Sequence, residues 1–282
     1  MKYIIYKGTG GLVHLLNGLQ QAIIIAKKEK RILLIDTILT GAFKHSFNDF
    51  FHIYDDELHY ICSYDQITDK NNLFFGNLHI DEIQTKGTRL IEGKYYLADT
   101  KIYIQENKNM ENELLRVYGG YAPEFIRHLK LNQDIIEMVY QNTSPLLDKH
   151  KEYASLHFRN TDMKNDIQLF VQKIKKVHKE KKISYFFIAT DNHKAFDEFK
   201  KKCPNIKFFR IFNVPNCQGK NIHYHHPDKK EIILNTFYDL YMIGKSKYFI
   251  PSMNSGFSKW IIFQRDHEKH NIFDEKFYFK VV

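Results

Sequence analysis

The sequence contains little cysteine and no long apolar run. Its three cysteines, Cys62, Cys203 and Cys217, are widely scattered and form no Cys-x-x-Cys pair. This spacing gives no disulfide framework or zinc site and fits reduced thiols. The densest apolar runs, 22–26 and 32–35, are far shorter than the ~18 residues of a membrane-spanning helix. The N-terminus lacks the features of a signal peptide, so we expect a cytoplasmic protein without stable membrane insertion.

Material for a globular core is plentiful. Hydrophobic residues make up 43% of the 282 residues, and aromatic residues 15%. That length suggests one large domain or two medium ones, each able to bury enough apolar surface to fold. The net charge of +9 suits a polyanionic partner. No nucleic-acid motif accompanies the charge, so we expect no nucleic-acid partner; the basic surface can still contact a membrane peripherally.

Strands and helices alternate at both ends of the chain. Apolar spacing predicts a strand at 3–6, a glycine loop, a helix over 12–28 and a strand at 31–35, which together form a βαβ unit. The second half repeats this alternation, with predicted strands at 153–158, 184–189, 206–212 and 247–250 and helices at 166–179, 193–202, 230–245 and 256–265. The fold class is therefore α/β, with two α/β domains facing each other.

The boundary between these domains is predicted near residue 145. A helix is expected over 122–141, and the polar run 142–145, which ends in Pro145, breaks its pattern and can begin a linker. This gives an N-terminal domain over 1–145. A C-terminal domain follows over 146–282, and its last helix can pack back on the first domain. The pattern of residues 40–120 assigns no elements.

One strand carries a candidate anion-binding arginine. In the predicted strand 153–158, His157 and the following Arg159 share one face, and Arg159 falls at the carboxyl end, where open α/β sheets bind ligands. A guanidinium there can grip a phosphate in a bidentate fashion. An equally simple interpretation is a surface arginine paired with Asp162.

Polar residues follow three further predicted elements. Ser252, Asn254, Ser255 and Gly256 lead from a strand into a helix, whose N-terminus can bind an anion or simply be capped by a hydroxyl. Asp191 follows a buried strand. Asp239 lies within a helix among apolar residues, where it is either exposed or needs a partner such as a nucleotide base or ribose.

Together these segments resemble the fucosyltransferase superfamily, which includes the core α1,6-, the nodulation and the protein O-fucosyltransferases. The resemblance rests on three motifs in order: His157-x-Arg159-x-Thr161-Asp162, Ala189-Thr190-Asp191, and the run from Asp239 to Ser252-Met-Asn-Ser255-Gly. The start, Gly10-Gly11-Leu12-x-x-Leu15-x-Asn17-Gly18-Leu19, is similar too. The similarity covers about 1–36 and 153–260.

The resemblance implies a GT-B-like enzyme whose second domain holds a nucleotide sugar, most simply GDP-fucose, and transfers the sugar to a glycan acceptor. It implies no cofactor beyond this co-substrate. Its two domains would be of the Rossmann type and face each other across a cleft, the first on the acceptor side and the second on the donor side. By motif position, Arg159, Ser252 and Ser255 would contact the diphosphate, and His157 and Asp239 would lie near the guanine and ribose. Further donor-binding residues would be Thr161, Asp191, Asn254 and Gly256. From the first domain, Gly10, Gly11, His14 and Asn17 would line the cleft.

The chain departs from the α1,6-type proteins at two positions. Asn160 stands where they carry a second consecutive arginine, and Gly256 stands where glutamine follows their serine pair. These departures bear on the donor sugar more than on the class of reaction. Another GDP- or UDP-sugar is therefore an alternative donor.

Transfer with inversion needs a base for the acceptor hydroxyl and positive charge for the departing diphosphate. No Asp-x-Asp pair occurs in the sequence, so we expect a metal-independent mechanism in which Arg159 and a helix N-terminus supply the charge. Asp166 is the first candidate base, because it follows the arginine at about the distance of the α1,6-type catalytic Glu. Asp162 is the second. Helix N-terminal charge complementarity also explains Asp166.

Three other interpretations compete with a transferase. Gly8-x-Gly10 with Asp36 resembles the fingerprint of an NAD-dependent oxidoreductase, although Val13 stands where the third glycine belongs. The histidines within 223–226 could bind a metal, but they lack the spacing of a structural zinc site, and a mobile loop explains them better. A glycan- or sugar-nucleotide-binding module without catalysis is the third alternative.

Overall fold

The computed structural model describes the chain except for residues 1, 9–10, 39–42, 68–73, 76–77, 80–83, 85–87, 92–93, 98–112, 116–127, 161–163, 218–221 and 268–270. The fold divides into two units, Met1–Asn132 and Gln133–Val282. Each unit is an α/β structure built on its own parallel sheet.

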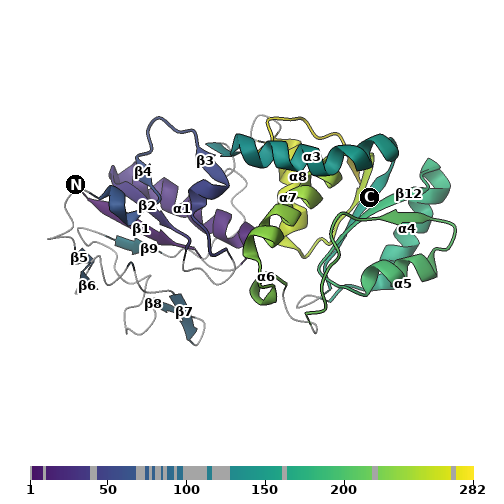
Figure 1. Cartoon of the computed structure of the whole chain (residues 1–282), viewed down its shortest axis with the longest axis horizontal. Helices are drawn as coiled ribbons and strands as arrows, with labels where there is room; N and C mark the ends of the chain where they lie inside the picture. The colour runs from purple at the N-terminus through teal and green to yellow at the C-terminus, as the bar shows by residue number, and fades with distance from the viewer. Residues whose placement is uncertain are drawn as a thin grey trace. The chain divides into compact units, whose positions relative to one another are not determined.

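The first unit contains the predicted βαβ motif. Strands β1 (Tyr3–Lys7) and β2 (Ile32–Asp36) pair in parallel, and α1 (Leu12–Glu29) connects them. β4 (Tyr60–Ile61) and β9 (Glu113–Leu115) extend this sheet to the order β4-β2-β1-β9 (Figure 1). The helix forms here because its apolar residues recur every three or four positions, and these residues are buried.

Short elements complete the first unit. Two 3-10 turns have capping boxes at their starts, η1 (Phe47–Asp49) and η2 (Tyr64–Gln66). The remaining strands pair in antiparallel fashion: β3 (Phe51–Ile53) with β10 (Leu129–Leu131), β5 (Phe74–Phe75) with β6 (Leu78–His79), and β7 (Thr88–Ile91) with β8 (Lys94–Leu97).

The second unit is a five-stranded parallel sheet of order β13-β12-β11-β14-β15. Its strands are β11 (Ala154–Phe158), β12 (Tyr185–Thr190), β13 (Lys207–Phe209), β14 (Tyr248–Ile250) and β15 (Lys280–Val281). Its helices are α3 (Gln133–Lys149), α4 (Ile167–Lys181), α5 (Ala195–Lys202), α6 (Ile222–His225), α7 (Lys229–Lys245) and α8 (Gly256–Asp266).

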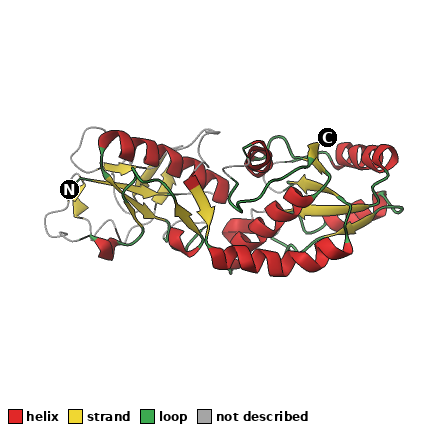
Figure 2. Cartoon of the chain, turned by 90° about the horizontal axis from the view of Figure 1, so that it is seen from above, coloured by secondary structure: helices red, strands yellow, loops and turns green. Residues whose placement is uncertain are grey.

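Helices cover both faces of this second sheet (Figure 2). Leu156 and Phe158 of β11 pack with α4 and α5 in one apolar cluster. Alternate residues point to the other face, where the His157 ring contacts Ser258 of α8 and the Tyr153 hydroxyl donates to the Met242 carbonyl of α7. The central strand β11 is therefore buried on both faces, as is usual in parallel sheets.

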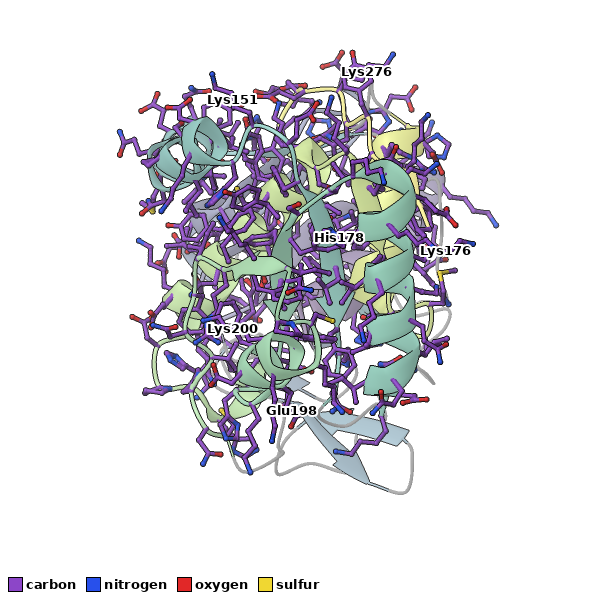
Figure 3. All side chains as sticks on the ribbon, turned by 90° about the vertical axis from the view of Figure 1, so that its right-hand side faces the viewer. Lys151, Lys176, His178, Glu198, Lys200 and Lys276 are labelled. Carbon is purple, nitrogen blue, oxygen red and sulfur yellow. The ribbon has the colours of Figure 1, made fainter. Side chains whose placement is uncertain are left out.

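The outer face of α4 is rich in lysine. Lys175, Lys176 and Lys179 are exposed there, whereas Ile174 and Val177 are buried against the sheet. Lys176 on α4 and Lys200 on α5 are labelled in Figure 3. The lysines thus occupy the solvated face of an amphipathic helix, which is the ordinary place for such residues.

The predicted break at 142–145 is wrong, because α3 continues through Pro145 to Lys149. Pro145 cannot donate to the carbonyl of Gln141, but Gln141 is exposed, so water can satisfy that group. The helix also begins later than predicted, at Gln133. Residues 129–131 form β10 instead, and residues 122–127 lie outside the described part of the chain.

Within the described ranges, no helix is long and apolar enough to cross a membrane.

Candidate functional site

Three neighbouring strands of the second sheet end in polar residues at the same edge. Arg159 follows β11, Asp191 follows β12, and Ser252 comes two residues after β14. Because β11 lies between β12 and β14 and all three run in parallel, these residues meet at the carboxyl edge. That edge is where open α/β sheets bind ligands.

The Ser252 hydroxyl joins the two segments on which the sequence analysis depends. It accepts the N–H of Arg159 at 3.1 Å and donates to the carbonyl of His157 at 2.7 Å. Ser252 is 1% exposed, and both of these bonds join its hydroxyl to backbone groups. It therefore fixes the start of the 252–255 loop against the end of β11.

His157 is a buried, neutral imidazole. Ser258 accepts the N–H of Ser252 at 3.1 Å, and its hydroxyl lies 2.8 Å from Nδ1 of His157. The Ser258 hydroxyl can therefore donate to Nδ1, which leaves the ring proton on Nε2. Burial, reinforced by the nearby charge of Arg159, lowers the pKa of His157 to about 3. The ring thus orients the loop and carries no charge at neutral pH.

This neutral histidine makes stability depend on pH. The folded-state pKa is about 3, below the unfolded value of about 6.5, so the unfolded chain binds the extra proton in between. The free energy of unfolding should fall as pH drops below about 6.5, by up to about 1.4 kcal/mol per pH unit from this group. His157→Asn, which keeps an acceptor near the Nδ1 position, should remove that part of the slope in denaturant titrations. A slope unchanged by the substitution would contradict a neutral His157.

The start of α8 is built to receive an anion. Ser255 caps the helix and is fully buried, yet its hydroxyl oxygen has no hydrogen-bond partner among the described residues. The first turn of α8 contains no acidic residue that would offset the positive end of the helix dipole. Asn254 is exposed beside it and Gly256 half-exposed. An oxyanion could accept from the Ser255 hydroxyl and the first backbone N–H groups together.

Asp191 holds Arg159 at the strand end. Its Oδ2 lies 3.9 Å from Nε of Arg159, and its Oδ1 accepts the N–H of Asn160 at 2.7 Å. The arginine thus lies beside Asp191; Asp162, the partner considered from the sequence, is outside the described residues. The Arg159 side chain is 23% exposed at this edge of the sheet. A planar guanidinium suits a phosphate group.

Asp239 is a carboxylate without a partner. It is half-buried on α7, and burial is the only cause that raises its pKa, well above the usual value. No hydrogen bond or ion pair to this carboxylate occurs in the part of the chain that the structure describes. Because an unpaired buried carboxylate is costly, such a group points to a ligand that supplies donors.

Asp166 is the N-cap of α4. Its exposed carboxylate accepts the N–H of Gln168 at 2.8 Å, so it stabilises the helix start whatever else it does. Thr161 and Asp162, the other candidates of this segment, lie outside the described residues. Asn165 donates its side-chain amide to the carbonyl of Arg159.

The candidates of the first unit lie at the start of α1. Gly11 is the N-cap, His14 is exposed and Asn17 is 7% exposed on the buried side, whereas Gly10 is outside the described part. Asp36, the ribose ligand required of an NAD-dependent oxidoreductase, is used otherwise. Its carboxylate is paired with the buried ammonium of Lys7 and accepts the hydroxyl of Tyr64 at 2.7 Å, so a ribose would have to displace both.

The histidines of the 223–226 segment adjoin the start of α7. His226 lies near the carboxylate of Glu231, with Nε2 3.6 Å from its oxygen, and its Nδ1 is 2.9 Å from the carbonyl of Asp228. These contacts connect the segment to the first turn of α7. Among the described residues, no group of three or more His, Cys, Asp or Glu lies close enough to hold a metal ion.

Two polar residues close to these candidates were not among the residues predicted from the sequence. Ser258 links His157 to Ser252, and Asn235 is a buried amide on α7. Ser258 lies three residues after Ser255, a spacing that places both on one side of a first helical turn. This spacing could have been recognised in the sequence. Asn235 precedes Asp239 by four residues, a spacing that predicts a shared helix face.

The fold is similar to those of solved fucosyltransferases. NodZ α-1,6-fucosyltransferase co-crystallised with GDP has a TM-score of 0.59 and 17% identity over 93% of this chain and 91% of that chain; fucosyltransferase NodZ from Bradyrhizobium gives the same TM-score and identity. POFUT1 in complex with GDP-fucose has a TM-score of 0.61 and 13% identity over 100% and 97%. No family model and no curated protein matches the sequence. The chain therefore has the fold of these fucosyltransferases.

Proposed function

We propose that the protein is a glycosyltransferase that moves fucose from GDP-fucose to a glycan hydroxyl with inversion. The observation that carries this proposal is the convergence of Arg159 with the start of α8. Ser252 links the two: its hydroxyl accepts the N–H of Arg159, its carbonyl accepts the N–H of Ser255, and its own N–H donates to the Ser258 hydroxyl of α8. An arginine and a helix N-terminus are each suited to oxyanions. NodZ and POFUT1, whose fold this chain shares, were solved with GDP or GDP-fucose. A GT-B arrangement, with the donor held mainly by the second unit, is part of the proposal.

The diphosphate is the leaving group of the reaction. As the bond from the anomeric carbon to the phosphate oxygen breaks, negative charge develops on that oxygen. Arg159 neutralises it, while Ser255 and the first N–H groups of α8 donate hydrogen bonds. Asp191 keeps the guanidinium aimed at this position. Asp239 accepts hydrogen bonds from the base, and Gly10, Gly11, His14 and Asn17 of the first unit contribute to the acceptor side.

Asp166 is the proposed base that takes the proton of the acceptor hydroxyl. Asp166→Asn keeps a good N-cap but removes the base, so we expect turnover to fall at least a hundredfold while the GDP affinity and melting temperature stay the same. Asp228→Asn, at the N-cap of α7, is the matched control and should change none of these. Unchanged turnover in Asp166→Asn would remove Asp166 as the base.

The proposed mechanism uses no metal ion, because the arginine and the helix N-terminus supply the positive charge. Transfer measured in EDTA should equal transfer without it. Loss of activity on chelation, restored by a divalent cation, would contradict this part of the proposal.

A thermal-shift series with nucleotide sugars tests the donor. GDP-fucose and GDP should raise the melting temperature, since ligands that bind the folded state stabilise it. GDP-mannose and UDP-sugars should raise it less. A response to a UDP-sugar or to NADH in place of GDP would favour the alternative donor or the oxidoreductase, respectively.

A further inference from the structure

One stripe of residues on α7 faces the side of β11 that carries Ser155 and His157. Asn235, Asp239, Met242 and Ser246 follow at intervals of four, three and four residues, so they lie on one side of the helix. The C-terminal end of this stripe contacts β11: the hydroxyl of Ser246, directly after the helix, lies 2.8 Å from that of Ser155.

From this contact, the positions of the other residues along the strand direction, toward the carboxyl edge of the sheet, can be estimated. The helix runs opposite to the strands, so residues before Ser246 lie nearer the carboxyl edge. Asp239 lies about 10 Å above Ser246 and Asn235 about 16 Å above it, at 1.5 Å per residue. Arg159 lies about 13 Å above Ser155 along the strand. Asp239 and Asn235 therefore bracket the level of Arg159.

Asn235 is a buried amide with nothing to bind. It is 9% exposed, and its Nδ2 has no hydrogen-bond partner among the residues that the structure describes. Asp239, on the next turn of the same stripe, likewise has none. Two unpartnered polar groups, one a donor and one an acceptor, are together a costly feature that a purely structural helix would lack.

Resting on the proposed function, we infer that Asn235 is a second residue that reads the guanine base. Its amide donates to the O6 carbonyl of guanine while Asp239 accepts from the adjacent N1–H and N2–H groups. Side chains four residues apart have Cβ atoms about 6 Å apart, a spacing that lets both reach one edge of a single base. Asn235 thus contributes to the preference for guanine over adenine.

Adenine reverses this pattern. It presents an amino group to Asn235, whose amide must turn over to accept it, and a bare ring nitrogen to the Asp239 carboxylate, which leaves two acceptors opposed. A site whose buried groups are satisfied only by the right ligand discriminates strongly. Asn235 is therefore expected to affect the choice of base, and not the grip on the diphosphate.

Calorimetric titration of wild type, Asn235→Leu and Thr236→Val with GDP, ADP and UDP tests the inference. Asn235→Leu should lower GDP affinity at least tenfold and shrink the GDP-to-ADP ratio by a similar factor. Its melting temperature without ligand should be equal to or above that of wild type, since the unpartnered amide is gone. Thr236→Val, the neighbouring control whose hydroxyl bonds only the Ile232 carbonyl, should bind as wild type does.

The possible results separate two failures. If wild type binds GDP and Asn235→Leu keeps the same GDP-to-ADP ratio, the assignment of Asn235 is overturned and the proposed function stands. If wild type binds no GDP, the proposed function fails and the base reading with it. If Asn235→Leu does not fold, Asn235→Ala replaces it. The GDP-to-ADP affinity ratio of Asn235→Ala should fall, and an unchanged ratio would overturn the assignment of Asn235.

Discussion

Arg159→Ala should lower the rate of fucosyl transfer at least a hundredfold. The substitution removes an oriented charge from the departing diphosphate, and a donor of this kind stabilises a transition state by roughly 3 kcal/mol. Arg159→Lys should restore only part of the rate, because an ammonium keeps the charge but loses the planar fork that Asp191 orients. Steady-state kinetics with GDP-fucose and a glycan acceptor measure both effects.

The control for this experiment is an arginine elsewhere in the same unit. Arg265 lies near the end of α8 and pairs with its neighbour Asp266, so Arg265→Ala should leave turnover close to wild type. A loss of tenfold or less in Arg159→Ala would mean that the phosphates lie elsewhere. Similar melting temperatures of the Arg159 variants and wild type are needed to attribute the loss to chemistry.

Asp239→Asn should weaken GDP binding at least thirtyfold and yet stabilise the unliganded protein. Hydrogen bonds to a charged acceptor are each worth about 2 kcal/mol, and asparagine presents only a neutral oxygen. Burial raises the folded-state pKa of Asp239 above the unfolded value of about 3.9, so the native state binds the extra proton. Wild-type stability from this group is therefore lost as pH rises through the raised pKa, and the variant avoids that loss.

The same carboxylate makes GDP binding depend on pH. Because the base donates to an ionised Asp239, affinity should rise with pH through the raised pKa in wild type and lose that rise in Asp239→Asn. The exposed Asp197 of α5 offers a control, and Asp197→Asn should change neither affinity nor its pH dependence. An Asp239→Asn variant that binds GDP as wild type does would remove the carboxylate from the base site.

Elements with strong periodicity could be predicted closely from the sequence. The helix expected over 230–245 is Lys229–Lys245, and that expected over 256–265 is Gly256–Asp266. In both, apolar residues recur at helical spacing and a polar cap stands at the start, so local and tertiary preferences agree. The same agreement explains why β11 and β12 were predicted closely: both strands are apolar and buried on both faces of the sheet.

Other elements depend on contacts that sequence spacing does not reveal. The helix α3 passes through Pro145 because the exposed position of Gln141 makes the lost hydrogen bond cheap. The final strand β15 pairs with β14 after an irregular segment. That segment is held by Glu275, which accepts the hydroxyl of Tyr140 and pairs with Lys245. Only the fold brings those three residues together.

The site shows the same division. The residues of the proposed site could be picked out because strand ends and helix starts place polar residues at predictable edges. The different surroundings of its two serine hydroxyls could not be predicted. Ser252 and Ser255 look alike in the sequence, but Ser252 is saturated by β11, whereas the buried hydroxyl of Ser255 has no partner among the described residues. The sequence also could not pair Arg159 with Asp191, which lies on the neighbouring strand.

The central claim is that Arg159 and the start of α8 grip one diphosphate. The most direct measurement is the affinity of wild type, Arg159→Ala, Ser255→Ala and the double variant for GDP and for guanosine. The account predicts that wild type prefers GDP strongly and that each variant loses preference without losing guanosine. It also predicts that the effects of the two substitutions are not additive, because both groups contact one ligand. A preference for GDP that survives in both single variants would contradict it.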